Sequence, residues 1–275
     1  MTYQSIMIHL NLEQTDESAL RITCDLADRF KSRVIGIAAG FPNMPVHSHG
    51  MIGSSVLEAD YKELKQAIAR CESRFRTALE SLGNSSEWRS DTAYPADFLA
   101  TEARAADLLI VGRPEKGAVF IQHQSLDIGD AVMTTGRPIL VVPPRKTCLA
   151  LNCVLIAWKD TAEARKAVSA ALPLLKRAQK VMIVEIVSDD REKDAAARRV
   201  ADVAKWLKSH KVTAAASAEL SAGEAGRHLD AIASENGVDV IVAGAYGHSR
   251  LREWVFGGVT RHLLQQSSMF ALLMH

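Results

Sequence analysis

The chain has 275 residues, 48% of them hydrophobic, and its 33 Lys and Arg residues against 32 Asp and Glu leave a formal net charge of +1. This length allows two domains of ordinary size, each with its own hydrophobic core. The balanced charge argues against a nucleic-acid-binding surface, and no apolar run approaches the ~18 residues that a membrane span requires, so neither partner is expected.

Short apolar runs alternate with stretches of helical periodicity along the first half. The runs predict β-strands, and apolar residues spaced three or four apart predict amphipathic helices. In chain order we expect a strand at 3–10, a helix at 16–31, a strand at 34–39, a helix from 56 to about 82, and strands at 106–112 and 138–142. The loop 41–55 carries two prolines and two glycines, and both a functional loop and disorder stay open for it.

A proline pair follows the last of these strands. Pro143 and Pro144 end a strand and cannot continue a helix, so 143–148 is predicted to be a linker between domains at 1–144 and 149–275. The four cysteines contain no C-x-x-C pair and no secretory signal precedes the first strand, which favours a reduced, cytoplasmic protein. Neither a zinc nor a redox site is expected, and no metal site is predicted elsewhere.

The second half repeats the order of the first. Strands are expected at 154–158, 181–187, 238–243 and 270–274, and helices at 164–175, 194–210 and from about 258 to 266. The runs 106–112 and 238–244 match at a shift of 132 residues, and at that shift 138–142 falls on 270–274. The chain is therefore interpreted as an internal duplication of an α/β unit, in which parallel sheets of about five strands are covered by helices on both faces.

A glycine-rich stretch separates the last strand and helix of the second half. It reads Gly244-Ala-Tyr-Gly247, then nine residues, then Gly257-Gly258-Val259-Thr260. Glycines let backbone N–H groups approach an anion, and a helix starting near Gly258 directs its unpaired amides to the same place. The spacing is neither the P-loop pattern nor the dinucleotide G-x-G-x-x-G, and glycine pairs are often only turn formers.

This G-x2-G-x9-G pattern, followed by a small residue, Val259 and Thr260, resembles the nucleotide-binding loop of the universal stress protein family. The closing run from Ser268 to His275 resembles the last strand of that family. The resemblance implies two doubly wound five-stranded parallel sheets with strand order 3-2-1-4-5, packed as an internal pseudo-dimer, with an adenine nucleotide at the carboxyl ends of strands 1 and 4. The family's usual Ser after the third glycine is replaced here by Gly258.

The implied ligand is ATP, with Mg²⁺ as an optional companion ion. Backbone amides of the loop and the Thr260 hydroxyl are expected to contact phosphate, and Ala157 and Val187 to line the base. Lys159 stands where the family often has an Asp; it is either a phosphate contact or a solvated side chain, just as Trp158 either lies against the base or caps the core. The predicted nucleotide-binding residues are Ala157, Lys159, Val187, Gly244, Gly247, His248, Gly257, Gly258, Val259 and Thr260.

The first half lacks the glycine pattern. Glu115 stands where the second half has Gly247, and Ser125 and Leu126 stand where it has Gly257 and Gly258, so the first domain is interpreted as a degenerate unit that binds no nucleotide.

The leading hypothesis is a cytoplasmic stress-response protein that binds ATP in its second half as a regulatory ligand. The alternatives are a nucleotide-free interaction scaffold and a slow ATPase in which Asp160 would be the acidic group at the crevice. No catalytic residue is predicted, and the tandem chain is a candidate for homodimerisation through surfaces outside the internal pair.

Overall fold

The computed structural model describes residues 2–13, 16–42, 54–80, 82–83, 85–115, 117–121, 123–221, 223–246 and 258–275. Its strands are β1 (Ser5–His9), β2 (Arg33–Gly40), β3 (Ser86–Thr92), β4 (Leu108–Gly112), β5 (Ile139–Val142), β6 (Cys153–Trp158), β7 (Lys180–Val187), β8 (Ala214–Leu220), β9 (Val240–Gly244) and β10 (Phe270–Met274). Its α-helices are α1 (Glu17–Phe30), α2 (Ser54–Leu79), α3 (Pro95–Glu102), α4 (Ile128–Thr134), α5 (Ala162–Leu175), α6 (Lys193–Ser209), α7 (Ala225–Glu235) and α8 (Gly258–Gln265).

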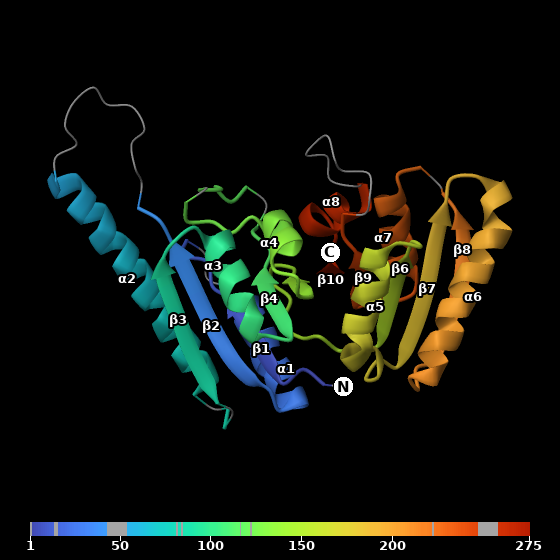
Figure 1. Cartoon of the computed structure of the whole chain (residues 1–275), viewed down its shortest axis with the longest axis horizontal. Helices are drawn as coiled ribbons and strands as arrows, with labels where there is room; N and C mark the ends of the chain where they lie inside the picture. Colours follow the sequence, from blue (N-terminus) through green and yellow to red (C-terminus); the bar gives the residue numbers. More distant parts are fainter. Residues whose placement is uncertain are drawn as a thin grey trace.

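The described strands form one continuous sheet in the order β3-β2-β1-β4-β5-β10-β9-β6-β7-β8. Within each half the strands are parallel and the order is 3-2-1-4-5, as the resemblance implied. The second half repeats that order in reverse across the sheet, so a pseudo-twofold axis lies between β5 and β10 (Figure 1). The predicted α/β fold with two tandem doubly wound sheets is confirmed.

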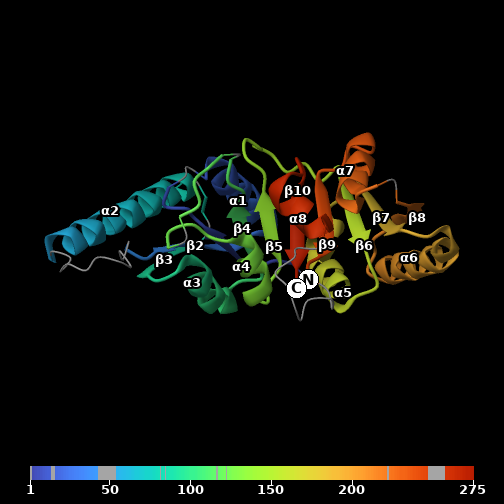
Figure 2. The same ribbon diagram turned by 90° about the horizontal axis from the view of Figure 1, so that it is seen from above.

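The two halves join through their last strands. β5 and β10 pair antiparallel, with Val141 opposite Ala271 and Leu140 opposite Leu272. Both strands are short and apolar, and an unpaired apolar edge would be left exposed in either half alone. The pairing removes both edges at once, and Figure 2 shows the two strands side by side at the centre of the molecule. The expected internal pseudo-dimer therefore has a sheet-continuing interface.

Two hydrophobic layers cover the sheet, one on each face. Along β1 the side chains alternate, so that Ile6 and Ile8 belong to the layer under α1 and α2, whereas Met7 belongs to the layer under α3 and α4. The second half repeats the arrangement, with α5 and α6 on the first face and α7 and α8 on the second. Each layer runs through both halves, and α2 and α6 lie at opposite ends of the molecule (Figure 1).

Side chains at the junction add to the pairing of the strands. The Tyr3 hydroxyl donates a hydrogen bond to the Ala170 carbonyl oxygen of α5 at 2.8 Å. The Arg177 guanidinium lies 4.5 Å from the centroid of the Phe30 ring and donates to the Arg29 carbonyl oxygen at 2.8 Å. The first contact joins the segment before β1 to α5, and the second joins the last turn of α1 to the segment just after α5.

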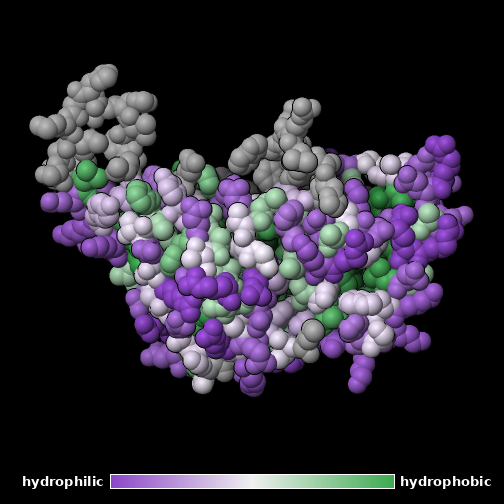
Figure 3. Space-filling view, viewed as in Figure 1, coloured by the Kyte–Doolittle hydropathy of each residue, from purple (hydrophilic) through white to green (hydrophobic). Residues whose placement is uncertain are grey.

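The surface is mainly polar. The face in Figure 3 is dominated by hydrophilic side chains, with apolar ones in small separate patches. The larger exposed apolar side chains of the described residues are scattered over different elements, among them Tyr61 in α2 and Trp206 in α6. Among the residues that the structure describes, no helix is long and apolar enough to cross a membrane.

Candidate functional site

The second half contains a cleft of about 750 Å³ at the carboxyl ends of its central strands. This is the edge at which parallel α/β sheets bind ligands. A crevice forms there between two neighbouring strands whose connecting helices run to opposite faces of the sheet. The ends of β6, β7 and β9 form its floor, and the first turns of α7 and α8 form one wall. A cleft of this volume is in the range of small-molecule sites.

The cleft brings together seven of the ten residues that the sequence singled out. They come from four separate segments of the second half: Ala157, Lys159, Val187, Gly244, Gly258, Val259 and Thr260. Gly247, His248 and Gly257 lie outside the described residues.

The wall formed by α8 carries polar groups of the kind that suit an anion. The helix begins at Gly258, and the first four N–H groups of an α-helix have no partner within the helix. Those amides and the positive end of the helix dipole favour an anion at the start of α8. Thr260 is 6% exposed and lines the cleft from the same turn. Among the described residues, an added Cβ at Gly258 would have only Glu224 near it, at 4.0 Å.

Gly244 occupies a different environment. It ends β9 directly against the first turn of α5, where an added Cβ would lie 2.7 Å from the Glu163 carbonyl carbon. Such a contact is too close for any side chain, so Gly244 is required by strand–helix packing. Thr161 caps α5, since its hydroxyl accepts a hydrogen bond from the Ala164 N–H at 3.3 Å.

The floor of the cleft is apolar. Ala157 and Val187 end β6 and β7, and Leu229 of α7 approaches from the opposite face. Trp158 also lines the cleft, but it is only 8% exposed and packs in the hydrophobic layer beneath α5 and α6. Of the two alternatives for Trp158, its burial favours the cap on the core.

Acidic and basic side chains are both present around the cleft. Lys159 lines it and is exposed. Glu185 lines it as well, but its carboxylate is ion-paired with Arg199 at 2.5 Å, and this hydrogen-bonded contact raises the pKa of Arg199. Glu192 lies at the rim. Asp160, the acidic group considered for hydrolysis, pairs with Arg165 at 2.6 Å and lines a separate groove between α5 and α6 rather than this cleft.

Tyr246 and Glu185 are among the lining residues that were not predicted from the sequence. Tyr246 follows β9 with a positive φ of 65° and is 7% exposed, so it shapes the cleft from within the glycine motif itself. The sequence feature that could have identified Tyr246 is its position two residues after Gly244. Glu185 is a carboxylate in the otherwise apolar run of β7, and that break in the run could have marked it.

The matching strand end of the first half is filled by a side chain. There Gly112 faces the Asp16 side chain, whose Oδ1 would lie 2.6 Å from an added Cβ. The loop after β4 also satisfies its own groups, because the Ile121 N–H donates to the Ser125 hydroxyl at 3.1 Å and Glu115 pairs with Arg145 at 3.1 Å. That the first half binds no nucleotide stays a prediction.

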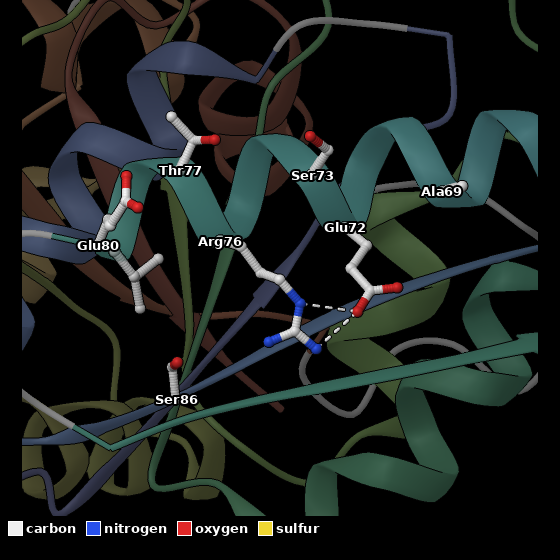
Figure 4. A pocket seen from close by; sticks show the side chains of 8 residues that line it. Ala69, Glu72, Ser73, Arg76, Thr77, Glu80 and Ser86 are labelled. Carbon is white, nitrogen blue, oxygen red and sulfur yellow. Dashed lines mark hydrogen bonds and ion pairs between the residues drawn. The ribbon is translucent and has the colours of Figure 1, made fainter.

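Another groove in the first half is lined by α2 and by Ser86 at the start of β3, so it does not lie at the carboxyl end of a strand. Figure 4 shows it between α2 and β3, with a volume of about 520 Å³. Its main polar feature is an exposed ion pair, Arg76 to Glu72 at 2.6 Å, on successive turns of α2. Pairs of this kind stabilise a helix surface and indicate no ligand. Within the described ranges, no three His, Cys, Asp or Glu side chains gather as a metal site.

Comparison with known proteins places this architecture. No family model matches the chain. A universal stress protein of Synechocystis sp., Slr1230, is 25% identical over 179 residues, which are 65% of this chain and 61% of that protein. A universal stress protein structure from Archaeoglobus fulgidus DSM 4304 superposes with a TM-score of 0.69 at 10% identity, covering 98% of each chain. The chain therefore has the fold of the universal stress proteins and is similar in sequence to one of them.

The agreement extends over both halves. A universal stress protein structure from Pseudomonas aeruginosa UCBPP-PA14 covers 99% of this chain, and the chain covers 93% of it, with a TM-score of 0.62 and 14% identity. Likeness over the whole length, rather than over one half, identifies the tandem two-domain arrangement as a universal stress protein fold. The chain spans about three fifths of the length of its Synechocystis relative, so the activity and partners of that protein do not carry over to this chain.

Proposed function

We propose that this chain is a universal stress protein that binds an adenine nucleotide, ATP, in the cleft of its second half as a regulatory ligand in the cytoplasm. The observation that carries the proposal is the convergence of the glycine-motif residues Gly244, Gly258 and Thr260 on one cleft with the apolar ends of β6 and β7. A polar helix start opposite an apolar floor suits a molecule with phosphates at one end and a flat base at the other.

The charges around the cleft support an anion at one end. Lys159 is free to approach a phosphate, whereas Glu185 is neutralised by Arg199. The phosphates would be held by the α8 amides and the Thr260 hydroxyl, and the base would contact Ala157 and Val187. A Mg²⁺ ion would enter on the phosphates.

The inventory of the cleft favours binding over chemistry. Fast phosphoryl transfer needs a base that positions water and charge arranged around the transferring group. Asp160 is engaged with Arg165 outside the cleft, and Glu185 is engaged with Arg199. We therefore expect steady-state phosphate release orders of magnitude below the ~10 per second of a median enzyme. Release at an ordinary enzymatic rate that is lost in Asp160→Asn would overturn this view.

Calorimetric titration with ATP tests the binding directly. One nucleotide per chain is expected. Gly258→Asp places a carboxylate at the start of α8 and should abolish binding, whereas Gly258→Ala, for which the structure has room, should bind nearly as well as the unaltered chain. Gly258→Ser restores the hydroxyl usual in the family and should tighten binding.

Two outcomes contradict the proposal. A stoichiometry of two would show that the first half also binds, and equal binding by Gly258→Asp and Gly258→Ala would place the nucleotide elsewhere. The absence of binding by the unaltered chain would favour the nucleotide-free interaction scaffold instead.

A further inference from the structure

Helix α8 is held at the end opposite the candidate phosphate site. Its first turn, Gly258 to Thr260, lines the cleft, and its last turn faces the first half of the molecule. The last four carbonyl oxygens of an α-helix lack partners within the helix, so they need donors from elsewhere. Arg113 supplies one of these donors: its guanidinium donates to the Leu263 carbonyl oxygen at 3.4 Å and also to the Ser267 carbonyl oxygen just past the helix.

Arg113 belongs to the half without the glycine motif. It follows Gly112 at the end of β4, and its N–H donates to the Val142 carbonyl oxygen of β5 at 2.8 Å. The matching residue of the second half is Ala245, whose N–H makes the equivalent bond to the Met274 carbonyl oxygen at 2.9 Å. An alanine has no side chain that reaches across the junction. The contact is therefore one-sided, from the first half to the second.

A second set of contacts fixes the same end of α8 from within its own half. The Asp230 carboxylate of α7 contacts the His262 Nε2 at 2.7 Å and accepts a hydrogen bond from the Ser267 hydroxyl at 2.8 Å. Helices α7 and α8 are also closely packed at Gly226, where an added Cβ would lie 2.6 Å from the Cβ of His262. Asp230 and Arg113 thus hold one short segment from two sides, with opposite charges.

The electrostatics favour this placement of Arg113. A cation is stabilised at the C-terminal end of a helix, where the dipole is negative. Burial of the half-buried guanidinium lowers the pKa of Arg113, and the nearby Asp230 carboxylate opposes that effect. Removing a desolvated guanidinium that donates to two carbonyl oxygens costs more free energy than removing a surface arginine.

We propose that Arg113 is a positioning residue through which the first half sets the affinity of the second half for its nucleotide. This inference rests on the proposed function. Arg113 touches no part of the cleft; it fixes the last turn of an eight-residue helix whose first turn carries the phosphate-binding amides. Because the helix is short, freedom at its last turn reaches its first turn, and part of the binding free energy is then spent on ordering α8.

The test compares Arg113→Met with Arg113→Lys and with Arg137→Met as a matched control. Arg137 is another arginine of the first half, which donates to the Arg104 carbonyl oxygen within that half. Arg113→Met should weaken ATP binding about tenfold in calorimetric titration, a coupling of ordinary size between two sites. Arg113→Lys, which keeps the charge and one donor, should recover most of the affinity, and Arg137→Met should bind like the unaltered chain.

Hydrogen exchange of the α8 amides provides a readout that needs no nucleotide. It should be faster in Arg113→Met without ATP, and unchanged in Arg137→Met. If the unaltered chain binds no ATP, the proposed function fails on its own. If α8 exchanges alike in all variants, or if ATP affinity is unchanged while α8 exchanges faster, the coupling is overturned. Should Arg113→Met unfold, the milder Arg113→Gln decides by the same two measurements.

Discussion

The Asp16 carboxylate accepts a hydrogen bond from the Asn11 N–H at 2.5 Å, and with this contact it fills the space beside Gly112. Asp16 precedes α1 with a positive φ of 39° and therefore turns its side chain inward instead of capping the helix. In the second half, the corresponding space beside Gly244 is filled by the backbone of α5. The two copies of one unit thus close the same strand end in different ways.

The first prediction concerns the pH dependence that follows from this burial. Desolvation raises the pKa of Asp16 from 3.8 to about 7, although the Asn11 N–H and the Arg74 charge oppose the shift. The native chain then holds a proton that the unfolded chain releases, so stability should fall as pH rises from about 4 to about 7. At ~1.4 kcal/mol per pKa unit the contribution is at most about 4 kcal/mol.

Asp16→Asn keeps an oxygen acceptor for the Asn11 N–H and removes the titration. Denaturant unfolding of both proteins at pH 4, 6 and 8 should show that the variant gains stability relative to the unaltered chain as pH rises. A constant difference across that range would show that Asp16 does not titrate there.

His9 provides a second prediction of opposite sign. Burial lowers the pKa of this histidine from 6.5 to about 4, and its Nε2 has no hydrogen-bond partner within the described residues. The native chain keeps it neutral while the unfolded chain takes up a proton, so its contribution to stability is lost as pH falls from 6.5 towards 4. His9→Leu should reduce this acid loss by up to about 3 kcal/mol, at ~1.4 kcal/mol per pKa unit. Unfolding curves of both proteins at pH 4.5 and 7.5 measure this effect. The same change in unfolding free energy between the two pH values in both proteins would contradict the prediction.

The third prediction separates the packing role of Gly244 from the general cost of losing a glycine. Gly244→Ala places a methyl group against the backbone of Glu163 and Ala164, which cannot withdraw without moving α5. We expect a loss of about 1–3 kcal/mol in the free energy of unfolding, as for other overpacked sites. Gly83→Ala is the control, because nothing lies within 4 Å of its added Cβ. Equal stability of the two variants would show that the contact at Gly244 is relaxed in solution.

The fourth prediction tests the junction between the halves. Val141 is 1% exposed and lies opposite Ala271 in the pairing of β5 with β10. Val141→Lys buries an unpaired charge there and should cost roughly 3 kcal/mol or more. Differential scanning calorimetry should then resolve separate transitions for the two halves. Val119→Lys, at a valine that is 76% exposed, should leave the curve unchanged. Independent unfolding of the halves in the unaltered protein would contradict the interface.

Much of the architecture follows from local pattern. The central strands show clear apolar runs, and α1 and α5 show clear helical spacing of apolar residues. Both patterns arise because these elements are buried on the sheet, where only apolar side chains fit. Repetition at a shift of 132 residues marked the two units, and the family resemblance implied that they pack as an internal pseudo-dimer. By contrast, the outer strands β3 and β8 were not predicted, since their exposed positions at the ends of the sheet allow polar and small residues.

The sequence by itself determined the chemistry of the glycine motif, because the freedom of glycine and the start of a helix are local properties. Tertiary structure alone decided which side chains meet it. Asp16 fills the first-half crevice because its backbone takes a left-handed conformation, and Arg113 reaches the end of α8 because β5 pairs with β10. Residues 113 and 267 are 154 positions apart in the chain. Contacts at that separation depend on how the two sheets join, and no local pattern encodes that geometry.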